Sequence, residues 1–204
     1  MDTHLRYGEG YQAKAWEPSL HFEHEHGLAG AIEQCNGQGV CRKLAPSGRE
    51  GTSGVMCPSF QATREEQNST RGRANLLRAL ITRPLTVDGG RSAVNGLSSM
   101  VYQALDLCLA CKGCKAECPS GVDMAKLKYE FENEYYKSHR RPLRDYLFGY
   151  FDVTARVASA FAPLTNAVMS VPIFKNAIAR ALGITEKRPF PKFATRRSRL
   201  RRDE

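Results

Sequence analysis

The sequence lacks an uninterrupted apolar run of the kind that crosses a membrane as a helix. Its longest stretch without a charged residue lies between Val157 and Phe174, and Pro163, Pro172 and several polar side chains interrupt it. Proline breaks a helix, and unpaired polar groups are costly in lipid. We therefore expect two short helices, broken at the two prolines and packed on the domain or on a partner, in place of a membrane span.

Signals for export and for β-structure are also missing. We find no secretory signal peptide, and no segment shows the apolar–polar alternation of a half-buried strand. Structural disulfides need an oxidising compartment, and seven cysteines are an odd number for full pairing. The sequence therefore predicts unpaired or metal-bound cysteines, a mainly α fold and a cytoplasmic location, with membrane association through partners left open.

The most informative stretch runs from Cys108 to Pro119 and reads CLACKGCKAECP. Its spacing, C-x2-C-x2-C-x3-C-P, is the ligand pattern of bacterial-type ferredoxins. Zinc sites usually pair two C-x2-C units across a longer loop, so the spacing favours an iron–sulfur cluster over zinc. The candidate ligands in this run are Cys108, Cys111, Cys114 and Cys118.

Three more cysteines precede this run. Cys35 and Cys41 lie in CNGQGVC, where two glycines permit tight curvature, and Cys57 repeats the Cys-Pro ending. In two-cluster proteins the fourth cysteine of such a run ligates the other cluster. This exchange groups Cys57 with Cys108, Cys111 and Cys114, and it leaves Cys35, Cys41 and Cys118 as a second set.

The second set is one ligand short of four. A histidine, water or a partner residue could complete it, or the site could hold a three-iron cluster. We expect two clusters, at least one of them [4Fe-4S]. The alternative is a single cluster held by Cys108, Cys111, Cys114 and either Cys57 or Cys118.

Apolar periodicity predicts helices from Ser69 to Arg83, from Leu97 to Leu107 and from Asp123 to Ser138. Ser69 or Thr70 can cap the first of them. Helices before and after a cysteine turn predict an α-helical ferredoxin-like domain, with irregular cysteine loops and extended N- and C-terminal segments. The expected inward positions are Ala74, Leu77, Ile81, Leu97, Val101, Ala104, Leu105, Met124, Leu127, Phe131 and Tyr135.

Charged residues pose two further questions. Arg71 and Arg73 stand in the first turn of a helix, where the macrodipole disfavours cations. They either serve an anionic group, such as a substrate carboxylate, a cofactor phosphate or a cluster, or they pair with Glu65 or Glu66. The histidines near the N-terminus, which are more often solvated than ligating, are His4, His21, His24 and His26.

The net charge of +9 is concentrated in an arginine-rich tail at residues 196–202. Such a tail could bind nucleic acid or an anionic membrane surface, although most tails of this kind are solvated. No helix-turn-helix or RNA-binding signature accompanies it, so we expect no nucleic-acid partner. Peripheral membrane contact stays open.

Three segments resemble the central iron–sulfur segment of large FAD-linked oxidoreductases that act on D-2-hydroxy acids, such as D-lactate or D-2-hydroxyglutarate. They read GLAGAIEQCNGQGVCRK, GVMCPSFQATREEQNSTRGRANLLR and LDLCLACKGCKAECPSGVDMAKLKYEF, and they cover most of residues 27–150. The resemblance implies electron transfer, in which a flavin takes hydride from the substrate and clusters pass single electrons onward. It implies two partners, an FAD-binding dehydrogenase domain or subunit and a cysteine-rich acceptor-side domain or subunit.

The sequence departs from the full family pattern because it has no FAD-binding domain and no cysteine after Cys118. FAD and the substrate site are therefore expected on a partner, and the chain is expected to be an oxidoreductase component without its own substrate site. The expected parts are an N-terminal extension (1–26), a two-cluster domain (27–143), a helical segment (144–188) and a basic tail (189–204).

Two other functions compete with this one. The first is a redox-sensing, nucleic-acid-binding regulator with a cluster, suggested by the basic tail. The second is an enzyme that uses an open cluster iron as a Lewis acid, suggested by the three-cysteine set. The second needs a catalytic acid or base, and no paired carboxylates or Ser/His arrangement supplies one in the sequence.

Overall fold

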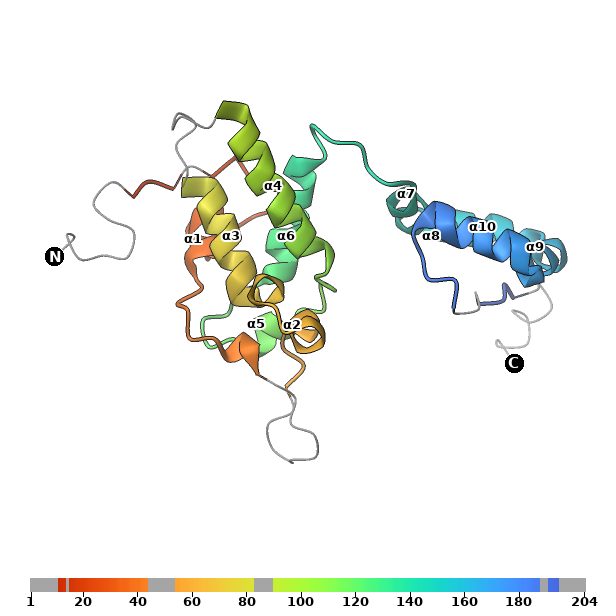
Figure 1. Cartoon of the computed structure of the whole chain (residues 1–204), viewed down its shortest axis with the longest axis horizontal. Helices are drawn as coiled ribbons and strands as arrows, with labels where there is room; N and C mark the ends of the chain where they lie inside the picture. Colours follow the sequence, from red (N-terminus) through yellow and green to blue (C-terminus); the bar gives the residue numbers. More distant parts are fainter. Residues whose placement is uncertain (1–10, 14, 44–53, 83–89, 188–190, 195–204) are drawn as a thin grey trace. The chain divides into compact units, whose positions relative to one another are not determined.

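The computed structural model describes residues 11–13, 15–43, 54–82, 90–187 and 191–194 (Figure 1). The chain divides into two compact units, Met1–Ser138 and His139–Glu204. Every regular element in the described residues is an α- or 3-10 helix and none is a strand, so the predicted mainly α fold is confirmed. The division into 1–26, 27–143, 144–188 and 189–204 stays a prediction.

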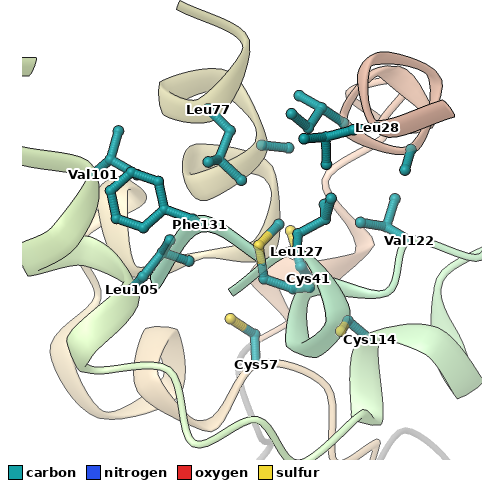
Figure 2. Close-up of a cluster of buried hydrophobic side chains, with 14 of the residues drawn as sticks. Leu28, Cys41, Cys57, Leu77, Val101, Leu105, Cys114, Val122, Leu127 and Phe131 are labelled. Carbon is teal, nitrogen blue, oxygen red and sulfur yellow. The ribbon is translucent and has the colours of Figure 1, made fainter. Parts of the chain in front are cut away.

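Four helices build the core of Met1–Ser138, namely α1 (Gly27–Glu33), α3 (Thr70–Thr82), α4 (Gly90–Asp106) and α6 (Met124–Tyr135). Figure 1 shows α3, α4 and α6 side by side, with α1 against α3. Their apolar faces meet in one cluster of buried side chains, which includes cysteines (Figure 2). Burial of each large apolar side chain stabilises the fold by about 1.5–3 kcal/mol.

The predicted helices and most of their inward positions are confirmed. Among these positions, the side chains at most 2% exposed are Ala74, Leu77 and Ile81 of α3, Val101 and Leu105 of α4, and Met124, Leu127 and Phe131 of α6. Ser69 caps α3, since its hydroxyl accepts a hydrogen bond from the Gly72 N–H at 2.9 Å. Helix α4 begins at Gly90, before the predicted start at Leu97, because the prediction relied on apolar periodicity and the first turns of α4 do not carry it.

Short helices carry the cysteine loops. They are η2 (Val40–Arg42), α2 (Pro58–Thr63), η3 (Glu66–Asn68) and α5 (Gly113–Glu117). In Figure 1, α2 and α5 lie at the same end of the bundle formed by the longer helices. The chain segments that bear Cys57 and Cys114 are therefore brought together at that end.

The segment that precedes α1 packs on α6. Trp16 meets Phe131 edge to face, with ring centroids 6.5 Å apart. Phe22 is buried, and the Lys126 ammonium lies 4.0 Å from the centroid of its ring. These contacts agree with aromatic side chains that cover another surface of the protein, and they make this part of the N-terminal region a component of the core.

Glu130 of α6 fixes the same segment with a buried carboxylate that is 1% exposed. It accepts hydrogen bonds from the backbone N–H groups of Ser19 and Leu20, both at 3.0 Å, and from the Trp16 Nε1–H at 3.4 Å. A buried carboxylate is costly unless donors of this kind surround it. No feature of the sequence pointed to this role.

The second unit, His139–Glu204, contains α7 (Leu143–Gly149), α8 (Phe151–Ala160), α9 (Ala162–Ser170) and α10 (Pro172–Leu182). Successive helices contact each other, yet among the described residues of this unit only Ala162 and Ala179 are buried. Many of its large apolar side chains are exposed. No helix in the described part of the chain has both the length and the apolar character needed to cross a membrane.

The breaks between these helices differ slightly from the prediction of two helices broken at Pro163 and Pro172. The breaks fall at Phe161 and Val171, and each proline lies in the first turn of the helix that follows. Proline ends a preceding helix but fits the first turn of the next, where its missing N–H has no intrahelical partner. The segment from Val157 to Phe174 therefore spans parts of three helices.

We predict that Glu130→Ala loosens the N-terminal segment. The substitution leaves three donors without their acceptor, and we expect a loss of about 2–3 kcal/mol in the free energy of unfolding, measured in urea. Trp16 is the only tryptophan in the chain, so its fluorescence reports on this segment directly. Its emission should shift to longer wavelength.

Glu134→Ala on the same helix is the matched control, because Glu134 forms a solvent-facing pair with Lys137. It should change both readouts little. Equal effects of the two substitutions would contradict the role assigned to the buried carboxylate.

Candidate metal centre

Four cysteines from two distant stretches of the chain line one cavity. Cys57, Cys108, Cys111 and Cys114 surround about 310 Å³ of space, which includes solvent at its mouth. Cys57 thus lies beside the cysteine run although it is far from the run in sequence. We call this space the four-cysteine cavity.

Left-handed residues shape the cysteine run. Ala110 (φ 50°) and Lys112 (φ 58°) stand on either side of Cys111. This conformation is uncommon for residues other than glycine, and it turns the chain sharply at each position. Cys108 follows the end of α4 and Cys114 lies in α5, so the turns bring three sulfur-bearing residues of one short segment to the same space.

Cys57 reaches the cavity on a loop tied to α5. It is itself left-handed (φ 57°) and stands just before α2. The carboxylate of Glu117 accepts hydrogen bonds from the backbone N–H groups of Val55 at 2.6 Å and Met56 at 3.2 Å. The helix that carries Cys114 therefore also holds the loop that carries Cys57.

The other three cysteines line a second cavity of about 280 Å³, again with solvent included at its mouth. They are Cys35, which follows α1, Cys41 in η2, and Cys118, which follows α5. Thr70 lines both cavities, so the two are neighbours. We call this second space the three-cysteine cavity.

The structure thus groups the seven cysteines as the ligand exchange predicts. Cys57 lies with the cysteine run, and Cys118 lies with Cys35 and Cys41. The alternative of a single cluster with Cys118 as its fourth ligand does not fit this grouping. Cys118 lines the three-cysteine cavity, whereas Cys108, Cys111 and Cys114 line the four-cysteine cavity. Ligation of iron by these sulfurs stays a prediction.

Arg73 places a buried positive charge at the four-cysteine cavity. Its guanidinium donates to the Cys57 sulfur at 3.7 Å, to the Ser59 hydroxyl at 2.9 Å and to the Ala104 carbonyl at 2.7 Å. The side chain is 2% exposed, and no carboxylate in the described residues pairs with it. A buried charge is costly without an opposite charge, so this site favours an anionic group in the cavity.

Arg71, unlike Arg73, pairs with a glutamate, which was the second alternative for the two arginines. It forms an ion pair with Glu66 at 2.8 Å and donates a hydrogen bond to the Gly37 carbonyl at 3.2 Å. The hydrogen bond from Arg71 lowers the pKa of the Glu66 carboxyl below its usual value. The alternatives for the two arginines therefore divide between them, since one pairs with a glutamate and the other faces a cysteine.

Cys41 in one cavity and Cys114 in the other are buried beside the start of a long helix. The backbone N–H of Arg71 in α3 donates to the Cys41 sulfur at 3.4 Å, and the backbone N–H of Met124 in α6 lowers the pKa of Cys114, against the larger effect of burial. Burial raises the pKa of both thiols above the usual value. A metal must displace these protons, and the helix N–H groups then stabilise the thiolates that form.

The residues present fit iron–sulfur clusters. Within the described ranges, no three His, Cys, Asp or Glu side chains are grouped closely enough to hold a single metal ion. The cysteines instead surround two spaces, with backbone N–H groups and a buried guanidinium directed at their sulfurs. His21, His24 and His26 are exposed and line neither cavity, and His4 lies outside the described residues.

Two contacts that position the cysteine loops were not predicted. Lys128 of α6 donates to the Cys108 carbonyl at 2.8 Å, and Arg78 of α3 donates to the Cys35 carbonyl at 3.2 Å. Both side chains were assigned no role because a basic residue on a helix gives no local sign of a carbonyl partner elsewhere in the chain.

Comparison with known proteins gives independent information. A family described as the 4Fe-4S dicluster domain matches residues 31–122. The D-2-hydroxyglutarate dehydrogenase of Pseudomonas putida is 31% identical over 177 residues, which cover 74% of this chain and 17% of that protein. The enzymes of that name from Haemophilus influenzae and Escherichia coli are 22% and 25% identical, over 74% and 77% of this chain and 17% and 18% of theirs. No solved structure matches the chain significantly.

The chain therefore spans less than a fifth of the length of these relatives. The resemblance to the iron–sulfur segment of these enzymes is confirmed. Residues 31–122 match the 4Fe-4S dicluster domain family, and most of the chain is similar to one segment of the D-2-hydroxyglutarate dehydrogenases, which supports its identification as an iron–sulfur segment of that kind.

Proposed function

We propose that this chain is the iron–sulfur electron-transfer module of a flavin-dependent 2-hydroxyacid oxidoreductase. It receives electrons from a flavin on a partner domain or chain and passes them to an acceptor. The observation that carries the proposal is the pair of neighbouring cavities, lined by four and three cysteines. Iron–sulfur clusters, when bound, take up and release single electrons.

The seven cysteines are the proposed ligands. Cys57, Cys108, Cys111 and Cys114 hold a [4Fe-4S] cluster in the four-cysteine cavity, and Cys35, Cys41 and Cys118 hold a second cluster. Arg73 supplies positive charge where the first of these clusters carries negative charge. The remaining residues bind and orient, and no residue is assigned to substrate chemistry.

FAD and the hydroxy acid are proposed to bind elsewhere, on an FAD-binding dehydrogenase domain or subunit. The small share of the relatives that this chain covers supports such a partner. A cysteine-rich acceptor-side domain or subunit is the second proposed partner. Exposed apolar side chains in His139–Glu204 support a protein contact there, since Phe148, Phe161 and Ile173 are each more than half exposed.

The chain, reconstituted with iron and sulfide without oxygen, should be brown and should accept electrons from photoreduced FAD. Bleaching of the visible absorbance measures the transfer. D-2-hydroxyglutarate without flavin should cause no bleaching, because the substrate site lies on the partner. A colourless, iron-free product, or bleaching by the hydroxy acid alone, would refute the proposal.

Cys41→Ser and Cys114→Ser should each remove one cluster and leave the other, because both positions are buried and solvent cannot take the place of the lost thiolate as it can at an exposed position such as Cys111. The two cysteines occupy equivalent buried positions, so each is the control for the other. Each variant should lose about half of the bound iron, and the double variant should lose nearly all of it. A Cys114→Ser variant without any iron, beside a Cys41→Ser variant with a full complement, would show that one cluster is present instead of two.

Arg73→Gln should lower the reduction potential of the cluster held by Cys57, because a positive charge stabilises the more negative reduced state. For a charge a few ångströms away at an effective dielectric constant of about 20, the effect is roughly 100–200 mV. A potentiometric titration followed by electron paramagnetic resonance (EPR) measures it. Arg64→Gln removes an exposed arginine and should leave the potential unchanged; an equal fall in both variants would rule out a local effect of Arg73.

A further inference from the structure

The two cavities are bordered by loops of the same design. The loop at 35–41 reads CNGQGVC, and the loop at 108–114 reads CLACKGC. When the first and last cysteines are matched, Gln38 takes the place of Cys111. The spacing of the first loop is then C-x2-Q-x2-C, which is the ferredoxin ligand pattern with its central cysteine replaced.

The backbone is left-handed at the same two positions of both loops. In the first, Gly37 (φ 82°) and Gly39 (φ 75°) flank the central residue, and in the second Ala110 (φ 50°) and Lys112 (φ 58°) do so. Gly39 and Lys112 each precede a short helix, with ψ values of 17° and 9°. Left-handed residues other than glycine are uncommon, so their presence at the same two positions as the glycines of the first loop supports an equivalence between the loops.

Burial repeats along with the backbone. The half-buried first positions are Cys35 and Cys108, the exposed central positions are Gln38 and Cys111, and the buried last positions are Cys41 and Cys114. The last cysteine of each loop lies beside the first turn of a long helix: Cys41 accepts a hydrogen bond from Arg71 of α3, and Cys114 lines its cavity together with Met124 of α6. Gln38 lines the three-cysteine cavity, as Cys111 lines the four-cysteine cavity.

We infer that the cluster in the three-cysteine cavity has one corner without a thiolate ligand, and that this corner lies at Gln38. The inference rests on the proposed function, since it requires a cluster in this cavity. Gln38 is exposed, so solvent reaches the corner. An iron held at this corner would lack a cysteine sulfur, and it would be the iron that the cluster loses first.

Other residues that line this cavity do not take the place of the missing thiolate. Met56 is 2% exposed and packs in the apolar core, and Arg71 is a cation paired with Glu66. The Asn36 side-chain oxygen accepts the Gln38 N–H at 3.2 Å and so serves the loop itself. None of these groups stands at the position that a cysteine occupies in the equivalent loop.

The loop can accept a new side chain at this position without a change of path. The Arg71 guanidinium holds the Gly37 carbonyl, and the two glycines supply the left-handed turns. The Gln38 side chain is exposed and makes no contact on which this path depends. A cysteine at position 38 should therefore present its sulfur as Cys111 does.

The test compares the reconstituted wild-type chain with Gln38→Cys after brief treatment with ferricyanide. Loss of an iron converts [4Fe-4S]²⁺ to [3Fe-4S]⁺ with release of Fe²⁺ and one electron, which ferricyanide accepts. EPR counts the three-iron product. The wild type should give about one such cluster per chain, and Gln38→Cys should give at least tenfold less.

Two matched variants complete the test. Cys111→Gln recreates the open corner in the four-cysteine cavity and should give about twice the wild-type signal, since both clusters then lose an iron. Gln38→Ala removes the glutamine without adding sulfur and should behave as the wild type does. Together they show whether a thiolate at the central position decides the stability of the corner.

The inference is overturned if the three-iron signal is the same in wild type and Gln38→Cys, or if Gln38→Ala suppresses it as strongly as Gln38→Cys. It is also overturned if Cys111→Gln gives no additional signal while its iron content matches that of the wild type. In each of these results the chain still holds iron and accepts electrons from FAD, so the proposed function survives. A chain that binds no iron at all would reject both.

Discussion

Negative charge on closely spaced sulfurs is the constraint on which the first unit depends. Thiolates repel one another and lose hydration when they are buried, and the raised pKa values of Cys41 and Cys114 express that cost. Helix α3 offsets much of it. Its first turn contributes Thr70 to both cavities, a backbone N–H to one buried cysteine and the guanidinium of Arg73 to another cysteine. The bundle thus places the start of a long helix between the two sites.

The cysteine loops at 35–41 and 108–114 form left-handed turns at matching positions with different residues. Glycine adopts the left-handed conformation at little cost, whereas Ala110 and Lys112 adopt it at a cost of order 1 kcal/mol each. The first loop has a further reason for glycine, because a Cβ on Gly39 would lie 3.0 Å from an Arg71 nitrogen. The crowding beside Arg71 therefore adds a reason for glycine at position 39, whereas a Cβ on Gly37 would meet no neighbour.

Much of this arrangement could be predicted from the sequence, because its strongest signals are local. The cysteine spacing identified the metal chemistry, and apolar periodicity located α3, α4 and α6. The two interpretations of Arg71 and Arg73 could not be separated in the sequence, since both arginines occupy the same helix turn and only the packing shows which one is buried. The role of Glu130 was missed for the same reason, because its partners Ser19 and Leu20 lie more than a hundred positions away in the chain.

The ligand pattern around Gln38 is hard to recognise in the sequence, because the central cysteine of the ferredoxin spacing is replaced. The interval between Cys35 and Cys41 looks irregular until the left-handed residues on both sides of Gln38 are matched with those around Cys111. Hydrophobic patterns do not report such conformations, and glycine only permits them. The repeated left-handed positions therefore revealed the likeness of the two loops better than their residue types did.

The position of Thr70 has a kinetic consequence. Because this single residue borders both cavities, the redox centres proposed for them are separated by a thin wall of protein. Electron tunnelling slows exponentially with distance, so exchange across such a wall is fast compared with transfer over a wider gap. In the proposed electron-transfer module, the slow steps would therefore fall at the outer faces of the pair, where a docked donor or acceptor would fix the remaining separation.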